Sequence, residues 1–130
     1  MKHTLKYGRE SFQFSFPEHA EFLSAREPEY TVNRSDFVKE LEAYLPDLPE
    51  QYANIGIVIA DKTRLCGYPL YLPWLLEVLK EKGATPETIT FYIAYGTHPR
   101  QTEEESLASY GESYRKYRFV HHDCYDQDAL

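Results

Sequence analysis

The stretch Ile55-Gly56-Ile57-Val58-Ile59-Ala60-Asp61-Lys62-Thr63-Arg64 is the main indication of the fold. Its apolar run stops abruptly after Ala60 at charged and turn-forming residues. A short β-branched run without polar alternation predicts a strand that is covered on both faces. The pattern returns at Ile89–Ala94, which runs into Tyr95-Gly96-Thr97-His98-Pro99-Arg100. Between the two runs, leucines at helical spacing predict a helix over about residues 70–82 with Pro73 in its first turn. Strand, helix and strand in this order predict a βαβ unit and a parallel pair of strands.

The flanking sequence predicts a hairpin before this unit and further elements after it. Residues 5–7 and 12–16 alternate apolar with polar on either side of Gly8, which is typical of a β-hairpin. Residues 35–45 have apolar side chains at helical spacing, with Ser35 as the expected N-cap.

The carboxyl-terminal third completes the predicted fold. Thr102 and Glu105 match a capping box at the start of a helix, and residues 117–121 predict a further strand. We therefore predict an α/β fold, a Rossmann-like parallel sheet with flanking helices, preceded by an N-terminal β-hairpin. We expect one domain over residues 1–130, with residues 1–17 as the hairpin, 18–34 as a connecting loop and 35–130 as the α/β unit.

Composition excludes several classes of function. The formal net charge of -7 disfavours nucleic acid as a partner, because binding to phosphates needs clustered basic residues. No apolar stretch approaches the length of a membrane span, and the first residues lack a signal-peptide core, so we expect a cytoplasmic protein with no membrane partner. Cys66 and Cys124 form no C-x-x-C pair, and we expect free thiols.

Asp61, Arg64 and His98 are the candidate functional residues. The carboxyl ends of parallel strands meet at one edge of a sheet, where open α/β folds place their ligands. Asp61, Thr63 and Arg64 offer an acceptor, a hydroxyl and a two-pronged cation, a set that suits carboxylate or phosphate recognition. His98 follows a glycine at the end of a strand, where an imidazole can act as a general acid or base. The alternatives are that Asp61 caps a helix or pairs with Arg64, and that His98 is a surface histidine.

Other motifs offer less chemistry. His121-His122-Asp123-Cys124 contains possible metal ligands, but adjacent residues of an extended strand point to opposite faces and cannot all reach one ion. We therefore assign no metal ligand to this chain. Neither a P-loop nor a G-x-G-x-x-G fingerprint is present, so a standard nucleotide enzyme of either kind lacks its phosphate-binding loop.

The two loops resemble those of the nickel-pincer lactate racemase family, and the similarity to its amino-terminal domain covers nearly the whole chain. It rests on the opening hairpin, on Asp61-Lys62-Thr63-Arg64, on Ala94-Tyr95-Gly96-Thr97-His98 and on the segment from Thr102 to Gly111. Members of this family interconvert stereoisomers of 2-hydroxy acids. They use a nickel ion held in a pyridinium-3,5-bisthiocarboxylate mononucleotide, the nickel-pincer nucleotide.

The resemblance implies a role for each matching residue. Asp61, Lys62, Thr63 and Arg64 would contact the nucleotide, and Arg64 would also face the carboxylate of a 2-hydroxy acid substrate. His98 would be one of two catalytic histidines. The family's second histidine, its lysine that is bound to the cofactor and its histidine ligand to nickel lie in a segment beyond Leu130. We therefore expect a truncated chain that is inactive alone and binds no cofactor by itself.

Two other functions remain open from the sequence. A non-catalytic module that binds a small molecule or a protein fits the acidic, tyrosine-rich composition equally well. A hydrolase or phosphoryl-transfer enzyme built on Asp61 and His98 would lack a phosphate loop and an evident nucleophile. Departures from the family pattern, at Leu65–Tyr68 and at Pro99, leave the identity of the 2-hydroxy acid open, and the oligomeric state is unknown.

Overall fold

The computed structural model describes residues 2–21, 23–26, 28–45, 54–64 and 66–126. Contacts divide the chain into two compact units, residues 1–31 and 32–130, and each is described by itself. The expectation of one domain over the whole chain stays a prediction.

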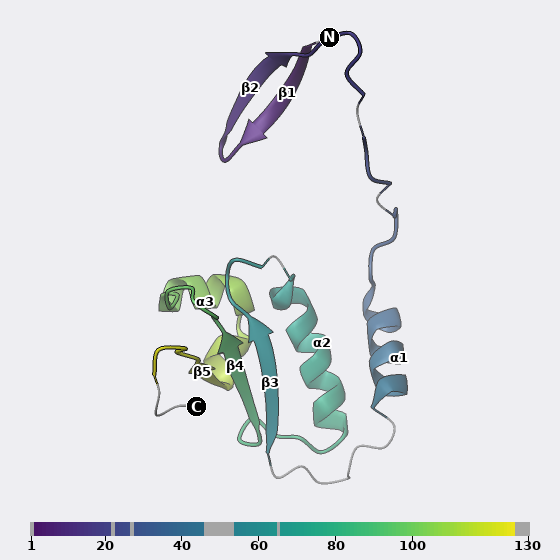
Figure 1. Cartoon of the computed structure of the whole chain (residues 1–130). Helices are drawn as coiled ribbons and strands as arrows, with labels where there is room; N and C mark the ends of the chain where they lie inside the picture. Colours follow the sequence, from purple (N-terminus) through teal and green to yellow (C-terminus); the bar gives the residue numbers. More distant parts are fainter. Residues whose placement is uncertain (1, 22, 27, 46–53, 65, 127–130) are drawn as a thin grey trace. The chain divides into compact units, whose positions relative to one another are not determined.

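The first unit contains the predicted hairpin. Strand β1 (Lys2–Tyr7) pairs antiparallel with β2 (Glu10–Ser15), as Figure 1 shows. Leu5 lies opposite Phe12 in the register of the pair. Gly8 has a φ of 60° in the turn, a conformation that favours glycine and matches the first central position of a type II′ turn.

The second unit is built on a parallel sheet. Its strands β3 (Ile55–Ala60), β4 (Ile89–Ala94) and β5 (Arg118–His121) lie side by side in the order β3-β4-β5, and both pairs are parallel. Ala60 lies opposite Ala94, and Ile93 lies opposite His121, so the three strands end at nearly the same edge. The predicted fold class and the parallel pairing are confirmed.

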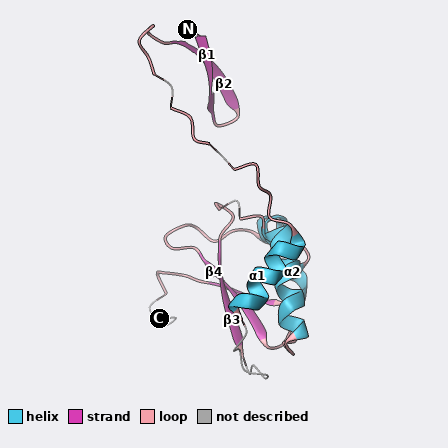
Figure 2. Cartoon of the chain, turned by 90° about the vertical axis from the view of Figure 1, so that its right-hand side faces the viewer, coloured by secondary structure: helices cyan, strands magenta, loops and turns pink. Residues whose placement is uncertain are grey.

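Helices cover one face of this sheet. Helix α2 (Tyr68–Glu81) connects β3 to β4, and α3 (Glu103–Tyr110) and α4 (Ser113–Lys116) lead from β4 to β5. Helix α1 (Arg34–Tyr44) packs against α2, as Figure 2 shows. The core lies between the helices and one sheet face. The sheet contributes Ile59, Phe91 and Ile93, and the helices contribute Leu72, Leu76, Leu79 and Tyr110. On the opposite face Val58 and Tyr92 are exposed.

The helix starts differ from the sequence predictions. Asn33, not Ser35, caps α1, because its side-chain oxygen accepts a hydrogen bond from the Asp36 amide at 3.0 Å. Helix α2 begins at Tyr68 rather than near residue 70, so Pro69 occupies its first turn and Pro73 lies inside the helix. The capping box of Thr102 and Glu105 is confirmed. In the part of the chain that the structure describes, no helix has the length and apolarity needed to cross a bilayer.

Candidate functional site

The loops after β3 and β4 meet at the carboxyl edge of the sheet. Asp61 follows the last residue of β3, and His98 lies in the loop that follows β4. Nδ1 of His98 lies 2.6 Å from Oδ2 of Asp61, a hydrogen-bond distance. The structure thus brings together the acid and the imidazole that the sequence placed at one edge. Asp61 pairs with His98 rather than with the Arg64 side chain.

Asp61 is held on both carboxylate oxygens. Its side chain is buried, with only 4% of the residue exposed, and Oδ1 accepts hydrogen bonds from the Thr63 amide at 2.9 Å and the Thr63 hydroxyl at 2.5 Å. Burial acts to raise the pKa of Asp61, but the hydrogen bonds from Thr63 and His98 outweigh it and hold this pKa below its usual value. The carboxylate is therefore ionised at neutral pH and can accept a hydrogen bond from a protonated ring nitrogen of His98.

The two cations of the first loop differ in their surroundings. The Lys62 ammonium forms an ion pair with Glu105 in the first turn of α3. Arg64 is exposed, and its guanidinium has no ion-pair partner among the described residues. Arg64 is therefore the cation of this loop that is available to an anionic ligand. Leu65, the next residue, lies outside the described residues.

Sequence reasoning missed Gln101, which is buried between the two loops with only 3% of the residue exposed. Its side-chain oxygen accepts a hydrogen bond from the Lys62 amide at 3.0 Å, and its side-chain nitrogen donates one to Oγ of Ser106 at 2.9 Å. A single polar residue in a polar loop gives no periodic signal, and only its place just before the cap Thr102 was visible in the sequence.

A second histidine lies beside this edge, at the end of β5. The hydroxyl of Tyr95 is 2.7 Å from Nδ1 of His121, and the hydroxyl of Tyr114 is 3.3 Å from Nε2. Burial lowers the pKa of His121, and the positive charge of Arg100 lowers it further. His121 is thus kept neutral between two tyrosines, an environment unlike that of His98.

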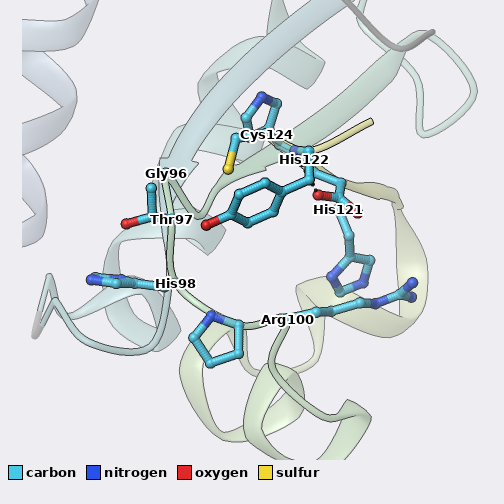
Figure 3. A pocket seen from close by; sticks show the side chains of 10 residues that line it. Gly96, Thr97, His98, Arg100, His121, His122 and Cys124 are labelled. Carbon is cyan, nitrogen blue, oxygen red and sulfur yellow. Dashed lines mark hydrogen bonds between the residues drawn. The ribbon is translucent and has the colours of Figure 1, made fainter. Parts of the chain in front are cut away.

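A cavity of about 370 Å³ opens between the loop after β4 and the residues that follow β5. Figure 3 shows His98 and Arg100 on the first of these segments, with His121, His122 and Cys124 across from them. The side chain of His98 is 48% exposed, so its imidazole is accessible to a ligand. Both cysteines are free thiols, as predicted. Within the described ranges, no three His, Cys, Asp or Glu side chains are grouped so that they could hold a metal ion.

Comparison with known proteins identifies the family of the chain. The sequence model of a family described as "Lactate racemase N-terminal domain" matches residues 7–130. The chain belongs to this family. The predicted resemblance is thereby confirmed.

Individual proteins similar to this lactate racemase N-terminal domain support the same family assignment. The lactate racemase of Thermoanaerobacterium thermosaccharolyticum is 32% identical over 97% of the chain. The structure of the lactate racemase apoprotein from the same organism superposes with a TM-score of 0.71 at 27% identity, over 95% of the chain and 30% of that protein. A crystal structure of a protein from Thermotoga maritima is 23% identical, with a TM-score of 0.62 over 75% of the chain and 23% of that protein, and shows the fold alone. The chain spans 32% of the length of the curated relative.

Proposed function

We propose that this domain supplies one half of the acid–base machinery of a nickel-pincer-dependent 2-hydroxyacid racemase or epimerase of the lactate racemase type. The observation that carries the proposal is the 2.6 Å contact between Asp61 and His98 at the carboxyl edge of the sheet. Family membership supports the reaction class, and the buried carboxylate behind an exposed imidazole supports the role of His98. A purely non-catalytic module is not favoured, because the family model and the named relatives that the chain matches are lactate racemases.

The hydrogen bond to Asp61 determines how His98 would act. An ionised carboxylate accepts a hydrogen bond, so Nδ1 of His98 carries the proton and Nε2 has a free lone pair. Nε2 then takes the proton of the substrate hydroxyl, and the imidazolium that forms lies next to the negative charge of Asp61. The same nitrogen returns the proton in the reverse direction.

Arg64 and its neighbours fit an anionic ligand. The guanidinium of Arg64, which has no ion-pair partner in the described part of the chain, suits a carboxylate or phosphate, because its planar donors bind either group in pairs. We propose that Arg64 binds the carboxylate of the 2-hydroxy acid and that residues 61–64 contact the nickel-pincer nucleotide. In the structure Lys62 forms an ion pair with Glu105, and the Thr63 hydroxyl donates a hydrogen bond to Asp61. The Arg64 side chain is therefore the one in this loop that is most free to bind the substrate carboxylate. When bound, the nucleotide supplies the acceptor for the hydride of the substrate carbon.

The proposal includes inactivity of the isolated 130-residue chain. Racemisation requires acid–base groups on both faces of the substrate carbon, and the resemblance matches only His98 in this chain. We expect no interconversion of D- and L-lactate by the isolated chain and no stoichiometric nickel by elemental analysis. One bound nickel per chain would contradict this expectation.

Replacement of His98 tests the proposal directly. In the complete gene product loaded with the cofactor, His98→Ala is expected to lower the kcat for D-lactate by roughly 10²- to 10⁴-fold, the usual worth of a general base. His19→Ala is the matched control, because His19 is exposed in the other unit and should leave kcat unchanged. Near-UV circular dichroism checks the fold of both variants. Near-normal turnover of His98→Ala would remove His98 from the mechanism.

A further inference from the structure

Gln101 joins three elements of the site at once. Through its side chain it contacts the first loop at the Lys62 amide and helix α3 at Ser106. Its own backbone belongs to the second loop, three positions after His98, and its amide donates a hydrogen bond to the Tyr95 hydroxyl at 3.4 Å. No other described side chain bonds both the first loop and α3 from a buried position.

We propose that Gln101 is a positioning residue that fixes the first loop against the second and thereby holds Asp61 on His98. The inference rests on the proposed function, because it assigns Gln101 a part in setting the protonation form of the proposed base. Gln101 touches neither His98 nor Asp61 in the hydrogen bonds of the structure, so it acts through the backbone of Lys62.

The orientation of the Gln101 amide is fixed by its partners. The Lys62 amide can only donate, so the carbonyl oxygen of Gln101 must face it and the side-chain nitrogen must face Ser106. The Ser106 hydroxyl in turn donates to the backbone oxygen of Thr102 at 2.8 Å, which leaves its oxygen free to accept from Gln101. Ser106 is completely buried, so this short network is anchored in the core rather than at the surface.

The tether acts on the peptide that follows Asp61. The amide nitrogen of Lys62 is bonded to the carbonyl carbon of Asp61, so a hydrogen bond to it restrains the peptide plane at which the Asp61 side chain begins. The Asp61 carboxylate is also held within its own loop by Thr63, and the residue before it, Ala60, is held by the hydroxyls of Tyr68 and Tyr110. Apart from the Asp61–His98 contact itself, Gln101 is the described residue whose side chain joins the peptide after Asp61 to the second loop.

The tautomer of the His98 imidazole reports on the hydrogen bond between Gln101 and the Lys62 amide, and it can be measured without any cofactor. In the 15N-labelled 130-residue chain, at a pH where His98 is neutral, ring nitrogen shifts are expected to show Nδ1–H as the main form. Gln101→Met removes both side-chain hydrogen bonds with little change in volume. We expect it to lower the ratio of the Nδ1–H to the Nε2–H tautomer about twofold or more, as for other members of one hydrogen-bond network. An unchanged ratio overturns the inference.

Three further variants separate a tether from a general loss of structure. Glu105→Gln removes the charge partner of Lys62 but keeps the capping box, and should leave the tautomer ratio unchanged. In the Asp61→Asn background, Gln101→Met should have no further effect, since it acts through Asp61. If Gln101→Met does not fold, Ser106→Ala should lower the ratio in the same direction, and no change in that variant also overturns the inference.

Asp61→Asn alone distinguishes failure of the proposed function from failure of the inference about Gln101. This variant should abolish the preference for Nδ1–H, because the amide no longer presents two acceptor oxygens. If Asp61→Asn leaves the tautomer unchanged, the proposed function loses the contact on which it rests. If Asp61→Asn changes the tautomer and Gln101→Met does not, only the inference about Gln101 fails.

Discussion

Asp61 and His98 are 37 positions apart in the sequence, yet their side chains meet at 2.6 Å across the ends of two neighbouring strands. The buried partner is the acid, and the exposed partner is the base. This asymmetry gives each residue a separate task. Asp61 keeps its charge in a fixed place, and the imidazole of His98, which is among the residues that line the neighbouring cavity, stays accessible from outside.

The lowered pKa of Asp61 predicts a pH-dependent contribution to stability. A carboxyl whose pKa is lower in the folded than in the unfolded chain stabilises the fold above its unfolded pKa of about 3.9, and this contribution is lost as the pH falls through the folded pKa. Urea unfolding of the wild type and of Asp61→Asn should therefore differ most near neutral pH. The difference in the free energy of unfolding should shrink in the acid range, and a constant difference from neutral pH to about pH 3 would contradict the prediction.

The sequence was sufficient to place Asp61 and His98 at one edge of the sheet, because the rule that brings them there is topological. Two apolar runs joined by a helix form parallel strands, and parallel strands end at the same edge, but the choice of His98 over Arg64 as the partner of Asp61 needed the structure. Gln101 obeys no such rule. Its burial depends on how α3 leaves the second loop, and neither periodicity nor charge pattern carries that information.

Helix starts were predicted less well for a local reason. Asn33 and Ser35 are both residue types that favour the N-cap position. Asn33 occupies it, and the hydroxyl of Ser35 donates a hydrogen bond to the Asn33 side chain at 2.8 Å. At α2, Gly67 adopts a φ of 66° and lets the helix begin at Tyr68, before the apolar spacing starts. Spacing of leucines marks the buried face of a helix, whereas the first turn is set by the backbone before it.

The lowered pKa of His121 predicts a second pH effect, in a higher range. A histidine whose folded pKa is depressed is protonated more readily in the unfolded chain, so its contribution is complete above about pH 6.5 and is lost as the pH falls. His121→Asn keeps an acceptor for the Tyr95 hydroxyl but cannot take up a proton. From about pH 7 to pH 5, the wild type should lose more free energy of unfolding than this variant. Parallel curves in urea titrations would show that His121 does not titrate as proposed.

Two glycines with similar backbone conformations should respond differently to alanine. Gly67 and Gly96 have φ values of 66° and 57°, so alanine at either position costs roughly 1–2 kcal/mol of backbone strain. A Cβ at Gly67 would also lie 2.7 Å from the Tyr71 ring, which is stacked on Phe37 and cannot easily move, whereas a Cβ at Gly96 meets nothing within 4 Å. Gly67→Ala should therefore be the more destabilising by about 1–3 kcal/mol in urea unfolding. Equal losses would show that Tyr71 gives way freely.

The hydroxyl of Tyr110 should be worth more than that of any exposed tyrosine. Tyr110 is completely buried, and its hydroxyl donates to the Ala60 carbonyl at 2.9 Å. Tyr110→Phe leaves that carbonyl without this donor and should lower the free energy of unfolding by about 1–3 kcal/mol. Tyr44→Phe is the matched control, because Tyr44 is 85% exposed and its hydroxyl can bond to water in either state. A loss no greater than that of the control would contradict the prediction.

The same residue, Ala60, links Tyr110 to a second tyrosine. The Ala60 amide donates to the Tyr68 hydroxyl at 2.8 Å, so the two hydroxyls together hold the last residue of β3 just before Asp61. Because both act on one residue, Tyr68→Phe and Tyr110→Phe should not be additive, and the double variant should lose less stability than the sum of the single ones by about 0.5 kcal/mol or more. Additive losses would mean that each hydroxyl stabilises its own helix and that neither positions the start of the Asp61 loop.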